Sequence, residues 1–460
     1  MATGTLVVLP SLSFPVAELV KIKGIVHYEE RLLFTLLLLR DPDQRIVYLS
    51  SLAIDPAVVD YYLGFLPDPA GARRRLHLVP VGESGPRPLS EKLLGRPDLV
   101  PELRALLADP RGARLLPFNV TPAEWALADA LGVPLYGSRT ELVALGSKSG
   151  SRRVARRAGV AVLEGDEALF SVEETAEALA RLRAERPGAG AAVIKLNNGF
   201  SGQGNAIVDL AGLADPLPAS PTVFCAAEES WPSFAAKVAA EGAVVEELVE
   251  DSGLASPSVQ LHLTPGGRVE LVSTHDQVLG GPAGQVYLGC RFPAAAGYRA
   301  STQDAARRVG EVLAGEGVVG WMGVDFVVMP GPGGAGVTLS EINLRMGGTT
   351  HPYWMARLAT GGVYDPAAGE LVAGGAAKCY VATDNLLSPS LVGRPPAAAI
   401  EAVEGAGLGY DPARATGTTL HLLGALTGYG KMGVTCIGDS EEEAEERFAE
   451  VGAKLGAAGG

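Results

Sequence analysis

The chain has 460 residues, of which 47% are hydrophobic, and a formal net charge of -14. Its length exceeds the size at which a single hydrophobic core usually stops growing, so we expect two or three domains. The acidic balance argues against a protein that grips phosphate backbones over a broad surface, because such binding depends on clustered Lys and Arg. We therefore expect no nucleic-acid partner.

Redox and targeting signals favour the cytoplasm. The four cysteines are Cys225, Cys290, Cys379 and Cys436. Their wide spacing fits neither a zinc site nor a disulfide framework. The stretch MATGTLVVLPSLSFP has no basic segment before its apolar run, unlike a secretory signal. The apolar run LLFTLLLL at 32–39 is too short to span a bilayer. We expect a cytoplasmic protein without membrane contact.

Residues 1–140 alternate short apolar runs with helical patterns. TLVVLP (5–10) and RIVYLS (45–50) predict strands, and 16–39 contains a long helical stretch. DPAVVDYYLGFL (55–66) begins with an Asp cap and a Pro in the first helical turn. Such alternation is typical of a parallel sheet with crossover helices. Because no Gly-x-Gly-x-x-Gly follows the first strand, a dinucleotide site there is unsupported.

A second unit, 141–375, begins just after Tyr136 and divides near residue 250. Its predicted strands are AAVIKL (191–196), AVVEELV (243–249), GVDFVVMP (323–330) and GVTLSEINL (336–344), the last two joined by the turn-rich GPGGAG.

A smaller C-terminal unit, 376–460, opens with KCYVATDNL. It ends with the acidic run DSEEEAEERFAEVGAKL, which predicts a capped, solvent-exposed helix.

The stretch SEINLRMGGTTHP (340–352) carries the first candidate site. Glu341, Asn343 and Arg345 are two residues apart, and alternate residues of a strand share one face, so their polar groups converge. Asp325 stands sixteen residues before Glu341 and comes alongside it if the two strands form a hairpin. Two carboxylates and an amide oxygen, with no His or Cys nearby, suit Mg²⁺. The alternative is a solvated, cross-strand polar patch.

Lysines and a glycine-rich loop form a second group of candidates. Lys195 lies inside the apolar strand AAVIKL, where a lysine is costly unless it is paired. The following NNGFSGQGN can close its backbone N–H groups over a polyphosphate, although Asn and Gly also mark an ordinary hairpin turn. Lys148, before the basic SRRVARRAG, is by itself typical of a surface lysine. Glu246 and Glu247 can contact an adenine, or simply end a strand in a polar loop.

Rival nucleotide and hydrolase motifs fail. GALTGYGKMG (424–433) has Ala425 where a Walker loop needs its first glycine and Met432 where it needs Ser or Thr. The sequence contains no Gly-x-Ser-x-Gly and no HExxH. A hydrolase reading therefore has no residues to support it.

Five elements, taken in order over roughly residues 140–375, resemble the ATP-grasp superfamily: Lys148, VIKLNNGFSGQG, VVEELV, GVDFVV and SEINLRMGG. The whole chain, with its GTLVVLPSLSFP start and its EINLRMGGTTHP loop, looks most like the pheganomycin-type peptide ligases. Two positions depart from the superfamily pattern. Leu196 follows the strand lysine where many members have Pro. No acidic residue falls clearly at the ribose-binding position after the hinge, and Gln260 and Asp251 are the candidates to replace it.

The resemblance implies an α/β fold with α+β character in the catalytic part. The N-terminal pre-ATP-grasp α/β domain would precede an ATP-grasp domain of two subdomains, with nucleotide between them, and a small C-terminal domain. ATP and Mg²⁺ or Mn²⁺ would be the cofactors. The implied nucleotide-binding residues are Lys148, Lys195, Gly199, Ser201, Gly202, Gln203, Gly204, Glu246, Glu247, Leu248 and Val249. The implied metal ligands are Asp325, Glu341 and Asn343.

The resemblance also implies which residues act on the activated acid. Arg345 would stand beside the transferred phosphoryl group, and Lys195 would assist it. Gly347 and Gly348 would let the backbone approach the acid substrate. His351 is a further catalytic candidate, although a lone His before Pro is more often structural.

For the acceptor side we expect contacts from STHDQVLGGPAGQVYLGCRFP. There His275 and Arg291 flank a glycine-rich loop. Arg291 can pair with a substrate carboxylate. A surface salt bridge is the alternative role for this guanidinium.

The implied function is an ATP-dependent carboxylate-amine ligase of peptide natural-product or antibiotic biosynthesis. It would form an amide bond through an acyl phosphate, with release of ADP and phosphate. Its partners would be a small carboxylic acid and an amine or peptide acceptor, and a homodimer is a superfamily-level expectation. One alternative keeps the fold, as a carboxylase or another amide ligase of primary metabolism. Another is a non-catalytic nucleotide-binding protein.

Overall fold

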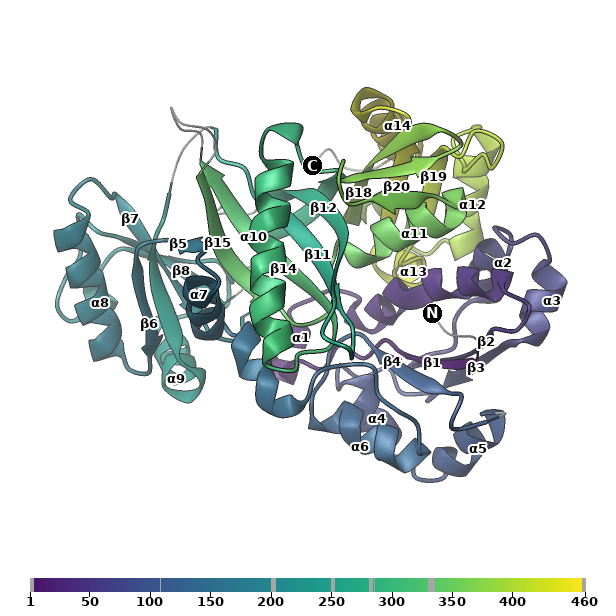
Figure 1. Ribbon diagram of the computed structural model, residues 1–460, viewed down its shortest axis with the longest axis horizontal. Coiled ribbons are helices and arrows are strands. Elements are labelled where there is room, and N and C mark those ends of the chain that lie inside the picture. The colour runs from purple at the N-terminus through teal and green to yellow at the C-terminus, as the bar shows by residue number, and fades with distance from the viewer. Residues whose placement is uncertain are drawn as a thin grey trace.

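The computed structural model describes residues 4–107, 109–199, 204–249, 253–280, 284, 286–329 and 336–456. Within these ranges the chain forms a four-stranded, a five-stranded and an 11-stranded sheet. Figure 1 shows them as a purple and blue N-terminal region, a small teal domain, and a large green sheet that continues into the yellow C-terminal region. No helix in the described ranges is both long enough and apolar enough to cross a membrane.

The N-terminal region is built on a parallel sheet of order β3-β2-β1-β4. Its strands are β1 (Thr5–Leu9), β2 (Arg45–Ser50), β3 (Leu76–Pro80) and β4 (Arg114–Pro117). Its helices are α1 (Val16–Leu19), the 3₁₀ helix η1 (Ile25–Arg40), α2 (Pro56–Leu63), α3 (Pro69–Arg74), α4 (Leu89–Leu94), α5 (Leu99–Leu106) and α6 (Pro122–Leu131). The two predicted strands and the predicted parallel sheet are confirmed. Asp55 caps α2 by accepting a hydrogen bond from Ala57 N at 2.8 Å.

The predicted helical stretch 16–39 is divided into two helices, α1 and η1. Gly24, the residue before η1, has a φ of 72°, in the left-handed region that favours glycine. A Cβ at this position would also lie 3.1 Å from the ring of Tyr429. The left-handed glycine ends any continuous helix at this point.

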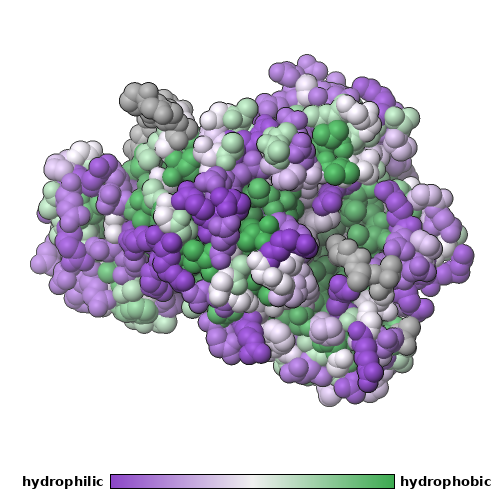
Figure 2. Space-filling view, in the orientation of Figure 1, coloured by the Kyte–Doolittle hydropathy of each residue, from purple (hydrophilic) through white to green (hydrophobic). Residues whose placement is uncertain are grey.

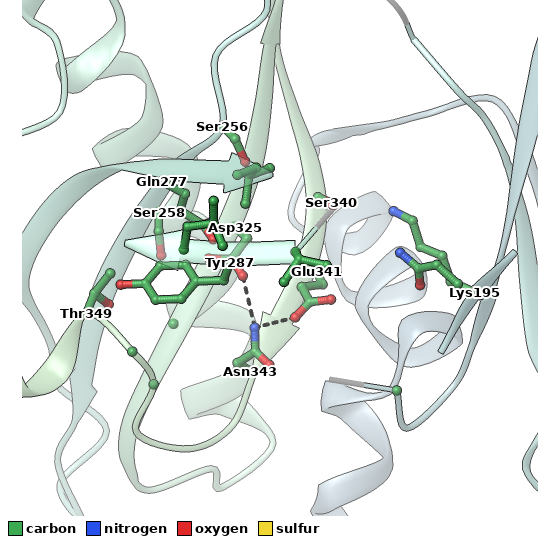
Figure 3. A pocket seen from close by; sticks show the side chains of 18 of the residues that line it. Lys195, Ser256, Ser258, Gln277, Tyr287, Asp325, Ser340, Glu341, Asn343 and Thr349 are labelled. Carbon is green, nitrogen blue, oxygen red and sulfur yellow. Dashed lines mark hydrogen bonds between the residues drawn. The ribbon is translucent and has the colours of Figure 1, made fainter. Parts of the chain in front are cut away.

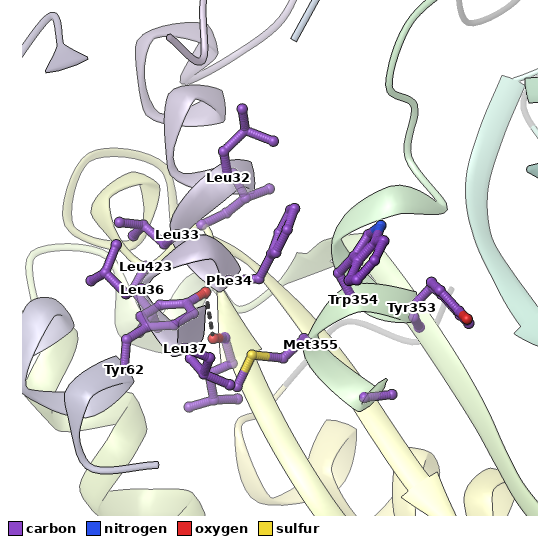
Figure 4. Close-up of a cluster of buried hydrophobic side chains, with 14 of the residues drawn as sticks. Leu32, Leu33, Phe34, Leu36, Leu37, Tyr62, Tyr353, Trp354, Met355 and Leu423 are labelled. Atoms are coloured by element: carbon purple, nitrogen blue, oxygen red, sulfur yellow. Dashed lines mark hydrogen bonds between the residues drawn. The ribbon is translucent and has the colours of Figure 1, made fainter. Parts of the chain in front are cut away.

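The apolar run 32–39 lies in η1 and packs between the N-terminal and C-terminal regions. Phe34 stacks on Trp354 with 6.2 Å between ring centroids. Figure 4 shows the η1 side chains beside Met355 and Leu423, which belong to segments far along the chain. Full burial of each such side chain contributes about 1.5–3 kcal/mol. The run is therefore a core element that fixes the N-terminal region against the C-terminal one.

The small domain is an antiparallel sheet of order β6-β10-β7-β8-β9. Its strands are β6 (Gly165–Leu169), β7 (Ala191–Leu196), β8 (Asn205–Asp209), β9 (Thr222–Phe224) and β10 (Ala243–Glu247). Its helices are α8 (Val172–Glu185), η3 (Leu217–Ala219) and α9 (Trp231–Glu241). The elements η2 (Thr140–Gly146), α7 (Lys148–Arg157) and β5 (Ala161–Val162) lead into it. The sheet packs its apolar face on α8 and α9, which gives this domain its own core.

The large sheet has the order β16-β17-β18-β13-β12-β11-β14-β15-β5, and β20 pairs with β18 and β19. Its central strands are β11 (Pro257–Leu263), β12 (Val269–Gly280), β13 (Val286–Phe292), β14 (Gly320–Met329) and β15 (Gly336–Asn343). The helix α10 (Ala296–Gly315) covers one face, and α11 (Thr350–Thr360), β16 (Val363–Asp365) and β17 (Glu370–Ala373) follow the last central strand. The predicted pairing of β14 with β15 is confirmed.

The sheet runs through the expected domain boundary near residue 375. The strand β18 (Ala376–Leu387) pairs with β13 on one side and with β20 (Lys431–Gly438) on the other. The remaining C-terminal elements are η4 (Pro389–Leu391), α12 (Pro396–Gly405), β19 (Gly417–His421), α13 (Gly424–Tyr429) and α14 (Glu441–Lys454). Ser440 caps α14, and Figure 2 shows a hydrophilic surface over this part of the molecule, which confirms the predicted acidic helix.

Candidate active site

A pocket of about 550 Å³ lies where the small domain, the large sheet and the N-terminal region meet. Seven of its lining side chains are Lys or Arg, and three are Asp or Glu. The pocket is therefore basic, although the whole chain carries a net charge of -14. Such local charge attracts anionic substrates.

The hairpin of β14 and β15 supplies the acidic part of the pocket. Asp325 and Glu341 are directly opposed in the strand register. Asn343 Nδ2 donates hydrogen bonds to Asp325 Oδ2 at 3.0 Å and to Glu341 Oε1 at 2.6 Å. Figure 3 shows the amide between the two carboxylates. The convergence predicted from the two-residue spacing is thus present.

The charge states of the two carboxyls differ because their neighbours differ. Burial, followed by the charge of Glu341, raises the pKa of Asp325 to about 7. Burial alone would also raise the pKa of Glu341, but the ammonium of Lys148 outweighs it and lowers that pKa to about 2. Two half-buried carboxyls this close favour a shared cation over mutual repulsion.

The donor chemistry fits a hard divalent cation. Asp325 and Glu341 offer carboxylate oxygens, and rotation of the Asn343 amide, whose orientation is assigned by hydrogen bonding, presents its oxygen. Among the described residues no three His, Cys, Asp or Glu side chains form a metal-binding group. Water and phosphate oxygens would therefore complete the coordination shell, as is usual for Mg²⁺.

The two predicted lysines reach the same pocket from different elements. Lys148, at the start of α7, forms an ion pair with Glu341 and donates to the Gly199 carbonyl at 3.2 Å. Lys195, on β7, pairs with Glu246 at 2.8 Å. Figure 3 places Lys195 on the wall opposite Glu341. Two lysines from different elements therefore line one pocket, each paired with a carboxylate.

Three of the four residues of the predicted adenine segment line the pocket, and Glu246 does not. Glu247, Leu248 and Val249 line the pocket. The Glu246 side chain is buried and accepts from Arg152 at 2.6 Å as well as pairing with Lys195. Its carboxylate is therefore committed to an internal ion-pair network, and the structure does not bring it to a nucleotide.

The glycine-rich loop between β7 and β8 is only partly described. Gly199 lines the pocket, and Gly204 accepts a hydrogen bond from Leu196 N at 2.9 Å. A Cβ on Gly199 would lie 3.1 Å from the Gly204 Cα, so the two ends of the loop approach closely. The remaining predicted residues lie outside the described residues: Ser201, Gly202 and Gln203.

Arg345 lines the pocket beside the hairpin and forms no ion pair with a carboxylate among the described residues. Its guanidinium lies 5.2 Å from the ring centroid of Phe14. Burial lowers the pKa of Arg345, an effect opposed by the nearby Glu341 and Asp325. Gly347 and Gly348 follow it along the pocket wall. A half-buried guanidinium without its own carboxylate can bind an anionic substrate group.

Three predicted residues lie away from the pocket. His275 is buried and hydrogen-bonded to Tyr380 OH at 2.6 Å, and burial lowers its pKa to about 3. His351 is also buried, and its Nδ1 donates to the Arg31 carbonyl at 2.8 Å. Arg291 pairs with Glu445 on the outer surface. The predicted substrate contacts of His275 and Arg291 and the catalytic role of His351 therefore have no support from the geometry.

The structure describes only one of the two residues that we expect at the ribose-binding position. Gln260 lines the pocket, but its amide is held by Ser273 at 2.8 Å and by Thr350 at 2.9 Å, so it fixes the framework of the sheet. Asp251 lies outside the described residues.

Several pocket residues were missed in the sequence. They come from η1, β18 and β20: Tyr28, Arg31, Asn385 and Lys431. The one local signal was Lys431 in the rejected GALTGYGKMG stretch, an isolated lysine beside apolar residues. Its position in a pocket depends on tertiary contacts that the sequence pattern does not specify.

Comparisons with known proteins agree with this geometry. The profile of the Pre ATP-grasp domain matches residues 36–133, that of IQCH-like, ATP-grasp matches 218–358, and that of the PGM1 C-terminal domain matches 398–450. The L-propargylglycine–L-glutamate ligase of Streptantibioticus cattleyicolor is 37% identical over 420 residues, 88% of this chain and 85% of that protein. The IQ motif-containing protein H of Danio rerio is 23% identical over 75% of this chain but only 38% of that protein.

Solved structures share the fold at low identity. Biotin carboxylase from Campylobacter jejuni, in a complex with β,γ-ATP, aligns with a TM-score of 0.60 and 14% identity over 100% of this chain and 92% of that chain. The biotin carboxylase domain of Hydrogenobacter thermophilus 2-oxoglutarate carboxylase, a complex with MgADP, ADP and bicarbonate, aligns with a TM-score of 0.58 and 13% identity over 98% of this chain and 90% of that chain.

Fold and site together define an ATP-dependent ligase that joins a carboxylate to an amine. The chain belongs to the ATP-grasp superfamily, among its pheganomycin-type ligases.

Proposed function

We propose that this protein joins the carboxylate of one amino acid or short peptide to the amine of a second amino acid in peptide natural-product biosynthesis. The observation that carries the proposal is the convergence of Asp325, Glu341 and Asn343 with Arg345 in one basic pocket. The name of the Streptantibioticus relative, which joins L-propargylglycine to L-glutamate, supports amino acids as the substrate class.

Mg²⁺, or Mn²⁺ in its place, would be held by Asp325, Glu341 and Asn343. A bound divalent cation neutralises phosphate charge during phosphoryl transfer. The ion pair between Lys148 and Glu341 would then give way, since Lys148 gains phosphate oxygens as partners. Lys195 stays anchored by Glu246 while its ammonium faces the pocket.

The reaction would proceed in two steps that balance without an external oxidant or reductant. An oxygen of the substrate carboxylate attacks the γ-phosphorus of ATP, the β–γ bond breaks, and ADP leaves. The amine then attacks the acyl carbon, loses a proton, and expels phosphate with the former carboxylate oxygen. Arg345 would stabilise negative charge in both transition states, an effect of about 3–4 kcal/mol for a well-placed donor.

The state of the cysteines supports a reducing compartment. Within the described residues the four cysteines are free thiols, which fits the reducing cytoplasm. A homodimer is the assembly that we propose, and light scattering of the purified chain would test it.

The decisive experiment measures ADP release with ATP and Mg²⁺ against pairs of amino acids, with mass spectrometry of the products. We expect ADP and phosphate to form when an acid and an amine are both present, with a product one water lighter than their sum. Formation of AMP and pyrophosphate would contradict phosphoryl transfer. ADP release that depends on bicarbonate instead of an amino acid would assign the protein to the carboxylases.

A further inference from the structure

A second group of polar residues lines the pocket on the side away from the hairpin. Tyr28 and Arg31 come from η1, and Lys431 comes from β20. Asp384 of β18 lies behind them and forms an ion pair with Arg31. We name these four residues the distal cluster. Tyr28 and Lys431 are 403 residues apart in sequence, so the cluster exists only in the folded chain.

The charges of the distal cluster do not balance. Asp384 forms an ion pair with Arg31 and also accepts a hydrogen bond from His421 Nε2 at 2.7 Å. Lys431 donates to Tyr28 OH at 2.6 Å and lies 4.9 Å from the centroid of the same ring. Among the described residues it has no carboxylate within 4.0 Å. The cluster therefore contains two cations but one carboxylate, and that carboxylate pairs with Arg31 and not with Lys431.

Burial makes this imbalance costly. Lys431 is only 7% exposed, and burial lowers its pKa to about 8, although Asp384 opposes the change. An unpaired ammonium group loses several kcal/mol of hydration when it is buried. The Nε atom of Arg31 is buried without a hydrogen-bond partner in the same cluster. The Lys431 ammonium, which lacks a carboxylate partner, and the Arg31 guanidinium both belong to residues that line the pocket, where a ligand can reach them.

The nucleotide phosphates are not the natural partner of this cluster. Their proposed ligands, Lys148 and Lys195, lie with the hairpin and the small domain. Along the large sheet, β20 is separated from β15 by β18, β13, β12, β11 and β14. Lys431 therefore approaches the pocket from the opposite end of the sheet. The anion that it meets belongs to the other substrates.

We propose that Lys431, with Arg31 and Tyr28, binds a carboxylate that does not react. Given the proposed ligase function, on which this inference rests, at least one substrate is an amino acid or peptide that keeps a free carboxylate in the complex. That group is either the α-carboxylate of the amine substrate or a second carboxylate of the acid substrate. The two sources share one chemistry, a carboxylate that accepts charged hydrogen bonds.

The test is equilibrium binding by calorimetry, with the full chain saturated with ADP and Mg²⁺. The probes are L-glutamate, its α-amide L-isoglutamine and its γ-amide L-glutamine. Lys431→Met removes the charge while keeping an unbranched chain, and Lys431→Arg restores it. Lys454→Met is the matched control, because Lys454 is a solvent-exposed lysine in the last turn of α14 and does not line the pocket.

We expect Lys431→Met to weaken L-glutamate binding by about tenfold or more and Lys431→Arg to recover most of it. Lys454→Met should change it by less than about twofold. The amide that no longer responds to Lys431→Met identifies the bound carboxylate: L-isoglutamine for the α-carboxylate, L-glutamine for the second one. Unchanged ADP affinity and an unchanged unfolding temperature would exclude a general structural effect.

Equal binding of L-glutamate by the wild type and Lys431→Met would overturn the inference, as would a wild type that binds all three probes equally or none of them. Tyr28→Phe gives an independent check, since it removes the hydroxyl that Lys431 contacts and should weaken L-glutamate binding in the same direction. Failure of the ligase proposal would appear elsewhere, as absent ADP release with every amino-acid pair, and is therefore distinguishable from failure of the carboxylate site.

Discussion

The two ends of the pocket differ in how their charges are balanced. At the hairpin end, Lys148 and Lys195 each have a carboxylate partner, Glu341 and Glu246. At the distal end, Lys431 has none among the described residues. Paired lysines can exchange their partner for a phosphate or metal-bound phosphate with little change in net burial of charge. An unpaired lysine instead indicates that the missing counter-ion arrives with a substrate.

The two ends also differ in how far apart in the sequence the segments that build them lie. The hairpin end is built from segments with recognisable patterns in one continuous part of the chain. The distal end joins η1 to β18 and β20, which are about as far apart in the chain as its length allows.

Arg345 lies between the two ends and has no carboxylate partner among the described residues. Arg345→Met should lower kcat for ADP release by about 1000-fold, because it removes charge stabilisation from both chemical steps. Arg357→Met is the matched control: Arg357 also lies over an aromatic ring, at 4.9 Å from Trp354, but it does not line the pocket. Equal losses in the two variants would show that the arginine acts through stability.

Glu341→Gln tests the hairpin end. The change keeps the side-chain volume but removes the charge that Lys148 and a metal ion would share, so turnover should fall by about 100-fold. The Mg²⁺ concentration needed for half-maximal rate should rise in the same assay. Glu311→Gln, on the exposed face of α10, should leave the rate unchanged. Near-wild-type turnover in Glu341→Gln would contradict the assignment of Glu341 as a metal ligand.

Gly348→Ala tests the wall between the two ends. A Cβ there would lie 2.6 Å from Cε1 of Tyr287, so this pocket-lining ring must shift, and KM for the acid should rise by about tenfold, or 1.4 kcal/mol. Gly347→Ala sharpens the result, because a Cβ at Gly347 meets no atom within 4 Å. Any rise in KM for that variant must come from the substrate itself. No effect in Gly348→Ala would place the acid elsewhere.

His275 gives a pH test of its structural role. Burial lowers its folded pKa to about 3, whereas an unfolded imidazole titrates near pH 6.5. Stability is therefore fully present above pH 6.5 and falls with decreasing pH, by about 1.4 kcal/mol per pH unit for this group. His275→Phe should make the fall of unfolding free energy between pH 6 and 4 shallower by that amount, measured by urea unfolding. Lost turnover with an unchanged slope would instead favour the catalytic role.

Much of the hairpin end could be predicted from the sequence. The two-residue spacing of Glu341, Asn343 and Arg345 predicts a common strand face, and the turn-rich sequence GPGGAG predicts a hairpin that can bring Asp325 alongside Glu341. The burial of Lys195 predicted that it has a partner. The identity of that partner, Glu246, required the pairing of β7 with β10, which no local pattern specifies.

The predictions that the geometry does not support also depend on contacts between distant parts of the chain. His275 and Arg291 share a segment with a glycine-rich loop, but Tyr380 and Glu445, which hold them, come from the C-terminal region. His351 follows the glycine pair closely, yet the first turn of α11 turns it into the core against the backbone of Arg31. Proximity in sequence to a site does not determine which way a side chain faces.

The most direct test of the proposed chemistry follows the carboxylate oxygen. An acid substrate labelled with ¹⁸O in its carboxylate is incubated with ATP, Mg²⁺ and the amine, and the released phosphate is analysed by mass spectrometry. The acyl-phosphate mechanism predicts one ¹⁸O in each phosphate formed. Unlabelled phosphate would mean that water, and not the substrate carboxylate, attacks ATP, and label in AMP would mean adenylation; either result would contradict the assignment of this pocket as a phosphoryl-transfer ligase.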